Sequence, residues 1–122
     1  MLVALASVGG AVLAQSLSGT MRDDRLIGSD DRDQISGGGG DDLIRGLERA
    51  DALNGGPDND TIYAGSTEES ARDVVEAGEG DDFVRVFNRP AARDLVDSGD
   101  GLDRVVADRR DVLAGCDRVR SS

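Results

Sequence analysis

The sequence predicts an all-β solenoid built from short strands, and three observations support this fold class. A nine-residue pattern recurs along most of the 122 residues. Each repeat opens with a glycine-rich turn and closes with a short aliphatic segment, as expected for a turn followed by a short strand. Aromatic residues make up only 2% of the chain, so its interior must be thin and aliphatic. Such a sparse core needs a metal ion or an unusual architecture for stability.

The repeat has Gly at position 1, Asp at position 6 and an aliphatic residue at position 8. Units that follow this register are Gly28–Ser36, Gly37–Arg45, Gly46–Asn54, Gly55–Tyr63, Ala77–Arg85 and Ser98–Val106. The position-6 residues are Asp33, Asp42, Asp51, Asp60, Asp73, Asp82, Asp94 and Asp103. The position-8 residues are Ile35, Ile44, Leu53, Ile62, Val75, Val84, Val96 and Val105. A helix would carry the glycines at a cost of about 1 kcal/mol each, so turns alternating with strands fit better, with position 8 pointing inward.

This pattern resembles the RTX, or haemolysin-type, calcium-binding nonapeptide repeat, G-G-x-G-x-D-x-U-x. The resemblance is most specific at GGGGDDLIR and extends from Gly28 to Val106. It implies a parallel β-roll, a right-handed β-solenoid with two nine-residue repeats per turn. It also implies that Ca²⁺ sits between the loops of successive turns, held by position-6 aspartates and loop carbonyls. Ca²⁺ accepts several oxygen ligands in a forgiving geometry, and glycine lets a loop aim its carbonyls at the ion.

With two repeats per turn, alternate loops stack on the same flank of the roll. On one flank, here called the acidic flank, loops 37–42, 55–60, 77–82 and 98–103 all have Gly second and contain no Arg. We expect calcium on this flank only, between successive aspartates. The predicted ligands are the carboxylates of Asp42, Asp60, Asp82 and Asp103, together with loop positions Gly37, Gly39, Gly55, Pro57, Ala77 and Glu79.

The opposite flank, here called the arginine flank, has loops 28–33, 46–51, 64–73 and 86–94, and each contains Arg. In this set Arg32, Arg72 and Arg93 directly precede a position-6 Asp, and Arg49 lies two residues before Asp51. A guanidinium there would repel Ca²⁺, and we expect it to neutralise an aspartate of the adjacent turn. The alternative is that these arginines simply face solvent.

The two ends of the chain and two insertions depart from the repeat. Residues 1–20 are interpreted as a signal peptide or apolar leader cut before Gln15, although no basic residue precedes Arg22. Residues 21–122 are assigned to the β-roll, with residues 107–122 as a C-terminal cap. Insertions at 64–72 and 86–93, the second with Pro90, are expected to bulge from the roll. Cys116 has no second cysteine to pair with, so either a free or intermolecular thiol or a small buried residue remains open.

Composition limits the possible functions. The net charge of −11 repels nucleic acid and attracts cations, and the apolar leader is too short for a lasting membrane span. The chain has no His, and the repeat accounts for nearly all its acids, so no enzymatic activity is expected. We expect a secreted, extracellular calcium-binding module whose folding is coupled to Ca²⁺ binding. A C-terminal calcium-dependent module of a larger secreted enzyme or adhesin is the alternative. Cell-surface adhesion and self-association stay open, because a roll has exposed end strands.

Overall fold

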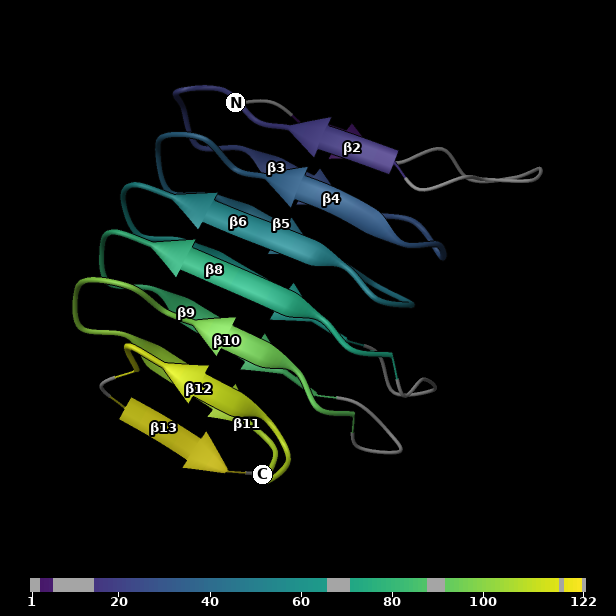
Figure 1. Ribbon diagram of the computed structural model, residues 1–122. Helices are drawn as coiled ribbons and strands as arrows, with labels where there is room; N and C mark the ends of the chain where they lie inside the picture. The colour runs from purple at the N-terminus through teal and green to yellow at the C-terminus, as the bar shows by residue number, and fades with distance from the viewer. Residues whose placement is uncertain (1–2, 6–14, 66–70, 88–91, 117, 122) are drawn as a thin grey trace.

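A computed structural model of the chain describes residues 3–5, 15–65, 71–87, 92–116 and 118–121. These residues form thirteen strands of three to five residues, which alternate between two parallel sheets facing each other (Figure 1). None of the described residues belongs to a helix long and apolar enough to cross a membrane.

The odd-numbered strands form one sheet and the even-numbered strands form the other. Sheet A contains β1 (Val3–Leu5), β3 (Arg25–Ile27), β5 (Leu43–Arg45), β7 (Thr61–Ala64), β9 (Phe83–Val86), β11 (Arg104–Ala107) and β13 (Arg118–Ser121). Sheet B contains β2 (Gln15–Ser18), β4 (Asp33–Ser36), β6 (Ala52–Gly56), β8 (Val74–Gly78), β10 (Leu95–Asp97) and β12 (Val112–Ala114). Neighbouring strands of a sheet are one full turn apart in sequence.

The register confirms two repeats per turn. In sheet A Leu43 pairs with Thr61, and in sheet B Gln34 pairs with Ala52. Both pairs join residues that are two nine-residue repeats apart. The predicted parallel β-roll is therefore the observed fold.

The core is a double ladder of position-8 side chains. In sheet A the ladder contains Leu26, Ile44, Ile62, Val84 and Val105, and in sheet B it contains Ile35, Leu53, Val75 and Val96. None of these side chains is more than 2% exposed. Each buried aliphatic side chain stabilises the fold by roughly 1.5–3 kcal/mol. Strand positions 7 and 9 point outward, because successive side chains of a strand alternate between its two faces.

The roll extends beyond the repeats identified in the sequence. The segment Gly19–Ile27 is a further unit, with buried Asp24 and Leu26 at positions 6 and 8. Before it, β2 pairs in register with β4, although its residues fall in the segment assigned to a leader. After the last repeat, β12 and β13 add one strand to each sheet. The leader interpretation stays a prediction, and residues 6–14 before the expected cut lie outside the described residues.

The two insertions fall only partly within the described residues. Residues 66–70 and 88–91, with Pro90, are not described, so the predicted bulges remain a prediction. The strand that follows each insertion pairs in register with the strand one turn earlier: Val74 pairs with Ala52, and Leu95 pairs with Val74. The insertions therefore leave the pairing of the sheets intact.

The loop 46–51 on the arginine flank takes a strained backbone. Leu47 and Arg49 have φ of 81° and 68°, in the left-handed region that side chains with a Cβ rarely adopt. Replacing Arg49 by Asn, which tolerates this region, is expected to raise the free energy of unfolding by about 0.5–1 kcal/mol. Urea denaturation at saturating calcium measures it. Arg32→Asn removes the same charge where φ is not left-handed, so it should bring no gain.

Candidate metal centre

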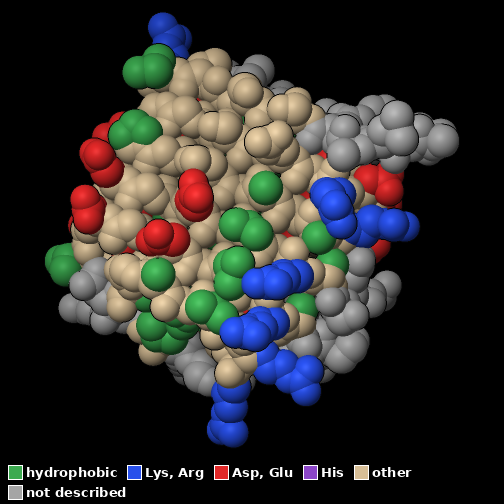
Figure 2. All heavy atoms as spheres, viewed as in Figure 1, with side chains coloured by type: hydrophobic (Ala, Val, Ile, Leu, Met, Phe, Trp, Pro, Cys, Tyr) green, Lys and Arg blue, Asp and Glu red, His purple; other side chains and the backbone are tan. Residues whose placement is uncertain are grey.

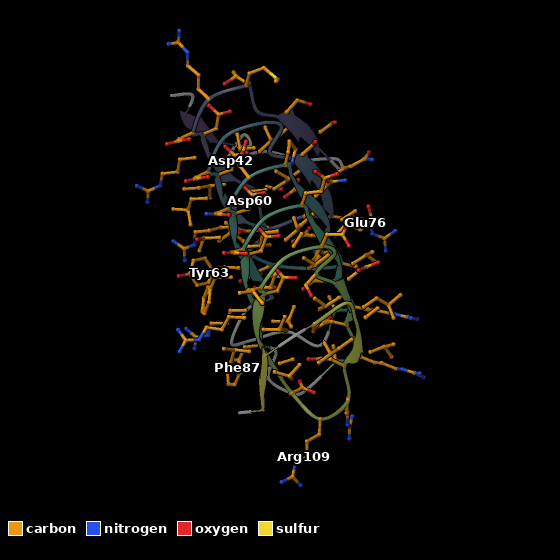
Figure 3. The ribbon with its side chains drawn as sticks, turned by 90° about the vertical axis from the view of Figure 1, so that its left-hand side faces the viewer. Asp42, Asp60, Tyr63, Glu76, Phe87 and Arg109 are labelled. Carbon is orange, nitrogen blue, oxygen red and sulfur yellow. The ribbon has the colours of Figure 1, made fainter. Side chains whose placement is uncertain are left out.

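The four aspartates predicted on the acidic flank lie in one file. The loops of this flank face the viewer in Figure 3, where Asp42 and Asp60 lie one above the other. The backbone N–H of Asp42 donates to Oδ1 of Asp60 over 2.8 Å, and that of Asp60 donates to Oδ1 of Asp82 over 2.7 Å. The N–H of Asp82 donates to Oδ1 of Asp103 over 3.0 Å. Each carboxylate thus bridges its own turn and the turn before it.

The second oxygen of these carboxylates is the unusual feature. The Oδ2 atoms of Asp42, Asp60 and Asp82 are buried and accept no hydrogen bond. The three residues are only 1–3% exposed. A buried carboxylate oxygen without a hydrogen bond costs several kcal/mol unless a cation or a proton reaches it. These three loops therefore present oxygen atoms that a cation would stabilise.

The pKa values of these aspartates also indicate a site that a cation would stabilise. Burial raises the pKa of Asp60 to about 7, and repulsion from Asp42 and Asp82 adds to the effect. Burial likewise raises the pKa of Asp42 and of Asp82 to about 6. Stacked carboxylates on successive turns resist ionisation because each is poorly hydrated and close to another negative charge.

A second ladder runs beside the first on the acidic flank. At position 5 the N–H of Asn59 donates to Oδ1 of Asp41, and the N–H of Asp81 donates to Oδ1 of Asn59. The ladder begins at Asp23 and ends at the N–H of Leu102. Its side chains accept from the following turn, whereas position-6 side chains accept from the preceding turn. The sequence analysis did not use position 5, although the Asp or Asn there in three of the four loops is a visible signal.

Glycine at position 2 allows the loops to stack closely. Gly38, Gly56, Gly78 and Gly99 have φ between 78° and 109°. A Cβ at any of them would collide with a backbone carbonyl oxygen of the turn before. Position-2 carbonyls are themselves used between turns, since Gly78 accepts from the N–H of Asp100 over 3.0 Å. The tight stacking is a property of this flank's backbone, and only glycine fits it.

The predicted carbonyl ligands lie in these same loops. Position 1 lies against the file, because a Cβ at Gly37 or Gly55 would lie 2.5 Å from Oδ2 of that loop's own aspartate, Asp42 or Asp60. Ala77 at the same position is fully buried. Position 3 is more open: Pro57 and Glu79 are exposed, whereas Gly39 is buried. The structure thus brings all the predicted residues to one flank, and their role as ligands stays a prediction.

Two loops satisfy their aspartate without an ion. Thr20 donates through its backbone N–H and its hydroxyl to the Asp24 carboxylate. Ser29 donates in the same way to the Asp33 carboxylate, with N–H to Oδ2 at 2.5 Å. A hydroxyl residue at position 2 therefore supplies the contacts that Gly38, Gly56 and Gly78 do not. Buried Oδ2 atoms also occur at Asp51 and Asp73 on the arginine flank, so burial of this oxygen alone does not select a flank. Among the loops with glycine at position 2, the candidate ion sites are those bordered by Asp42, Asp60 and Asp82.

The arginine flank carries the same position-6 ladder but not the predicted arginine–carboxylate ladder. The N–H of Asp73 donates to Oδ1 of Asp94 over 2.7 Å. Within the described part of the chain, Arg32, Arg72 and Arg93 are exposed and make no ion pair, so no continuous ladder forms. Burial has the largest effect on the pKa of Asp94 and raises it, whereas the charge of Arg72 on the adjacent turn still lowers it. Of the four arginines only Arg49 makes an ion pair, with Asp31 of the adjacent turn at 3.6 Å. Backbone N–H groups already hold these carboxylates, and the arginines extend into solvent.

Acidic side chains occur on both flanks, whereas the loops of the acidic flank from residue 37 onward contain no arginine. In Figure 2 acidic side chains lie at the left, in the centre and at the right, and most arginines lie toward the right and the lower end. Across the described residues, no three acidic, His or Cys side chains converge on one point. An ion between two turns would therefore take most of its ligands from backbone carbonyls, which suits a hard cation such as Ca²⁺.

A β-roll with buried carboxylates between glycine-rich turns defines a class of cation-binding repeat proteins. The model of the RTX calcium-binding nonapeptide repeat matches residues 18–48, 45–67 and 69–85, more than half of the chain. The chain belongs to this family, and calcium is the ion that its repeats bind. Asp42, Asp60 and Asp82 lie within the matched segments, and Asp103 lies beyond them. Comparison with curated proteins and with solved structures gives no match.

Acid should stabilise the calcium-free roll. The pKa values of Asp42, Asp60 and Asp82 are raised above the ordinary 3.8, so the folded state binds protons more tightly than the unfolded state. Stability is therefore greatest below about pH 4 for these groups and falls as pH rises through about 6–7. Calcium affinity should show the reverse trend, because the ion displaces these protons. Circular dichroism in chelator and calcium titrations across this range measure both, and parallel trends would contradict the assignment.

Proposed function

We propose that this chain is an extracellular calcium-binding module whose β-roll folds when calcium binds on the acidic flank. The observation that carries the proposal is the file of buried Oδ2 atoms on Asp42, Asp60 and Asp82, which accept no hydrogen bond. In the absence of an ion, these buried carboxylates repel one another between successive turns. Calcium would neutralise them and join successive turns.

Coupling of folding to binding follows from where the ligands come from. Each proposed site lies between two turns, so its carboxylates come from residues eighteen to twenty-two positions apart. Such a site hardly exists in the unfolded chain, so the free energy of binding contributes directly to the free energy of folding. Extracellular calcium modules of this type typically bind at roughly 10⁻⁴–10⁻³ M, which suits a chain that folds outside the cell.

Circular dichroism with and without calcium tests the proposal. In chelator near neutral pH we expect a largely unfolded spectrum, and in millimolar calcium we expect a cooperative gain of β structure. Magnesium at the same concentration should be a poor substitute, because it demands strict octahedral geometry. Calorimetric titration then gives the stoichiometry. A spectrum that is the same in chelator and in calcium would overturn the proposed coupling, although calorimetry could still detect binding to a preformed roll.

A role as the calcium-dependent part of a larger secreted enzyme or adhesin is compatible with the same fold. A roll of stacked turns presents open strand edges at its ends, where a neighbouring domain can continue the sheets. No group of residues in the described part of the chain forms a catalytic arrangement, so catalysis would come from such a neighbour. Expression with the flanking gene segments and an activity assay with and without calcium test this alternative.

A further inference from the structure

The outer face of sheet A has a composition unlike the rest of the molecule. Its charged side chains on β3, β5, β9 and β11 are all arginines: Arg25, Arg45, Arg85 and Arg104. No acid occupies an outward position on the five strands from β3 to β11 of this sheet. The outer face of sheet B, by contrast, carries Glu76 and Asp97 and no arginine on β2 to β12. In a chain of net charge −11 such segregation leaves one face suited to an anion.

Two arginines on this face flank the single tyrosine of the chain. Arg45 pairs with Tyr63 across β5 and β7, and Tyr63 pairs with Arg85 across β7 and β9. The two arginines are therefore two strand spacings apart, roughly 10 Å. Tyr63 packs edge-on against Phe83 with ring centroids 6.1 Å apart, and the Arg85 guanidinium lies 5.9 Å from the ring centre of Phe87. In Figure 3, Tyr63 and Phe87 lie on the same side of the roll, opposite Glu76.

A cavity of about 380 Å³ opens at this row of residues. Its lining includes Arg45, Tyr63, Arg85 and Phe87, together with Asp30 and Glu48 from the arginine-flank loops. The volume lies within the usual range for small-molecule sites. The lining thus combines guanidinium groups, aromatic rings and carboxylates, and each of these favours a different part of a ligand.

The lining fits an acidic sugar better than other anions. A guanidinium fork matches a carboxylate, an aromatic ring packs against the apolar face of a sugar ring, and carboxylates accept hydrogen bonds from hydroxyls. Asp30 and Glu48 would repel a densely charged polymer such as DNA, which carries about one charge per 1.7 Å. A polysaccharide with one carboxylate on some of its sugars has a much lower charge density. We propose that the row Arg45–Tyr63–Arg85 binds a carboxylate-bearing polysaccharide chain.

In this arrangement Arg45 and Arg85 hold carboxylates of the chain and Tyr63 packs against a sugar between them. Because Tyr63 is the only tyrosine and the chain has no Trp, tyrosine emission reports on this surface alone. The test uses the full chain in calcium and titrates a hyaluronan oligosaccharide, whose uronate groups alternate with neutral sugars. We expect a saturable change in emission and a matching calorimetric isotherm.

The double variant Arg45→Gln, Arg85→Gln should weaken this binding at least about tenfold, since it removes both charged contacts. The double variant Arg22→Gln, Arg109→Gln removes the same charge at exposed positions away from the cavity and should change affinity less than about twofold. Circular dichroism in calcium verifies that each variant is folded. Loss of oligosaccharide binding can therefore be distinguished from loss of calcium-coupled folding. Absence of binding, equal loss in both double variants, or equal binding of a neutral oligosaccharide, single-stranded DNA or anionic lipid vesicles would overturn the proposal.

Discussion

Replacing Asp60 by Asn is expected to change stability in opposite directions with and without calcium. In chelator the variant should be more stable than the wild type, by on the order of 3 kcal/mol at about pH 8, because it removes a buried charge. The pKa of Asp60 is raised to about 7, which shows how unfavourable that charge is. The asparagine Oδ1 can still accept from the N–H of Asp42, so the inter-turn hydrogen bond is retained.

In calcium the same variant should lose affinity by at least about tenfold, since Asp60 borders the proposed sites toward both Asp42 and Asp82. Asp94→Asn is the matched control, because burial also raises the pKa of Asp94, to about 6, but this residue lies on the arginine flank. It should share the gain of stability in chelator and keep the wild-type calcium affinity. Circular dichroism in chelator, which gives the folded fraction of each variant and of the wild type, and calorimetric titration with calcium measure the two quantities. Equal loss of calcium affinity in the two variants would show that the ions are not restricted to the acidic flank.

Gly38→Ala should strongly destabilise the roll. Gly38 has φ of 91°, and its added Cβ would collide with the carbonyl oxygen of Thr20. The left-handed backbone alone costs about 1–2 kcal/mol for a residue with a Cβ, and backbone on both sides of the clash has little room to move. We expect a total loss of roughly 2–4 kcal/mol at saturating calcium.

The adjacent glycine provides the control for this prediction. Gly39 is not in the left-handed region, and an added Cβ would meet the flexible end of Met21 at 3.3 Å. Gly39→Ala should therefore change the free energy of unfolding by less than about 1 kcal/mol. Urea denaturation of the two variants in calcium gives the comparison. Similar losses in both would mean that glycine content as such, and not the backbone approach at position 2, stabilises the loops.

Much of this fold could be predicted from the repeat, because every unit has the same order of turn and strand residues and therefore takes the same local backbone. The periodic Asp and aliphatic residues predicted both the buried ladder and the single file of Asp42, Asp60, Asp82 and Asp103. The unit at Gly19 obeys the same rules and was reachable from sequence by extending the register by one repeat. Most glycines with a left-handed φ lie at positions 2 and 4 of the acidic-flank loops, whereas the position-1 glycines that define the register do not have a left-handed φ.

Contacts between turns were harder to predict, since they depend on which groups face each other across the stack. Arg72 and Arg93 precede buried aspartates in sequence, yet their side chains point to solvent and backbone N–H groups hold the carboxylates. Likewise, Thr20 and Ser29 sit where other loops have glycine, and only coordinates show that their hydroxyls bind the carboxylate. The row Arg45–Tyr63–Arg85 is spread over more than forty residues of sequence, and the pairing of the strands alone brings it together.

The ladders at positions 5 and 6 give each turn of the acidic flank the same pattern of donors and acceptors on its upper and lower sides. Identical building blocks can be added to such a stack without redesign. Duplicating a segment of eighteen residues, the separation between Asp42 and Asp60, would lengthen the molecule and reproduce every contact. Duplicating only nine residues would exchange the flanks of everything downstream and set arginine-bearing loops against the carboxylate file. Tandem growth of this protein is therefore expected in whole turns, with half-turn steps disfavoured.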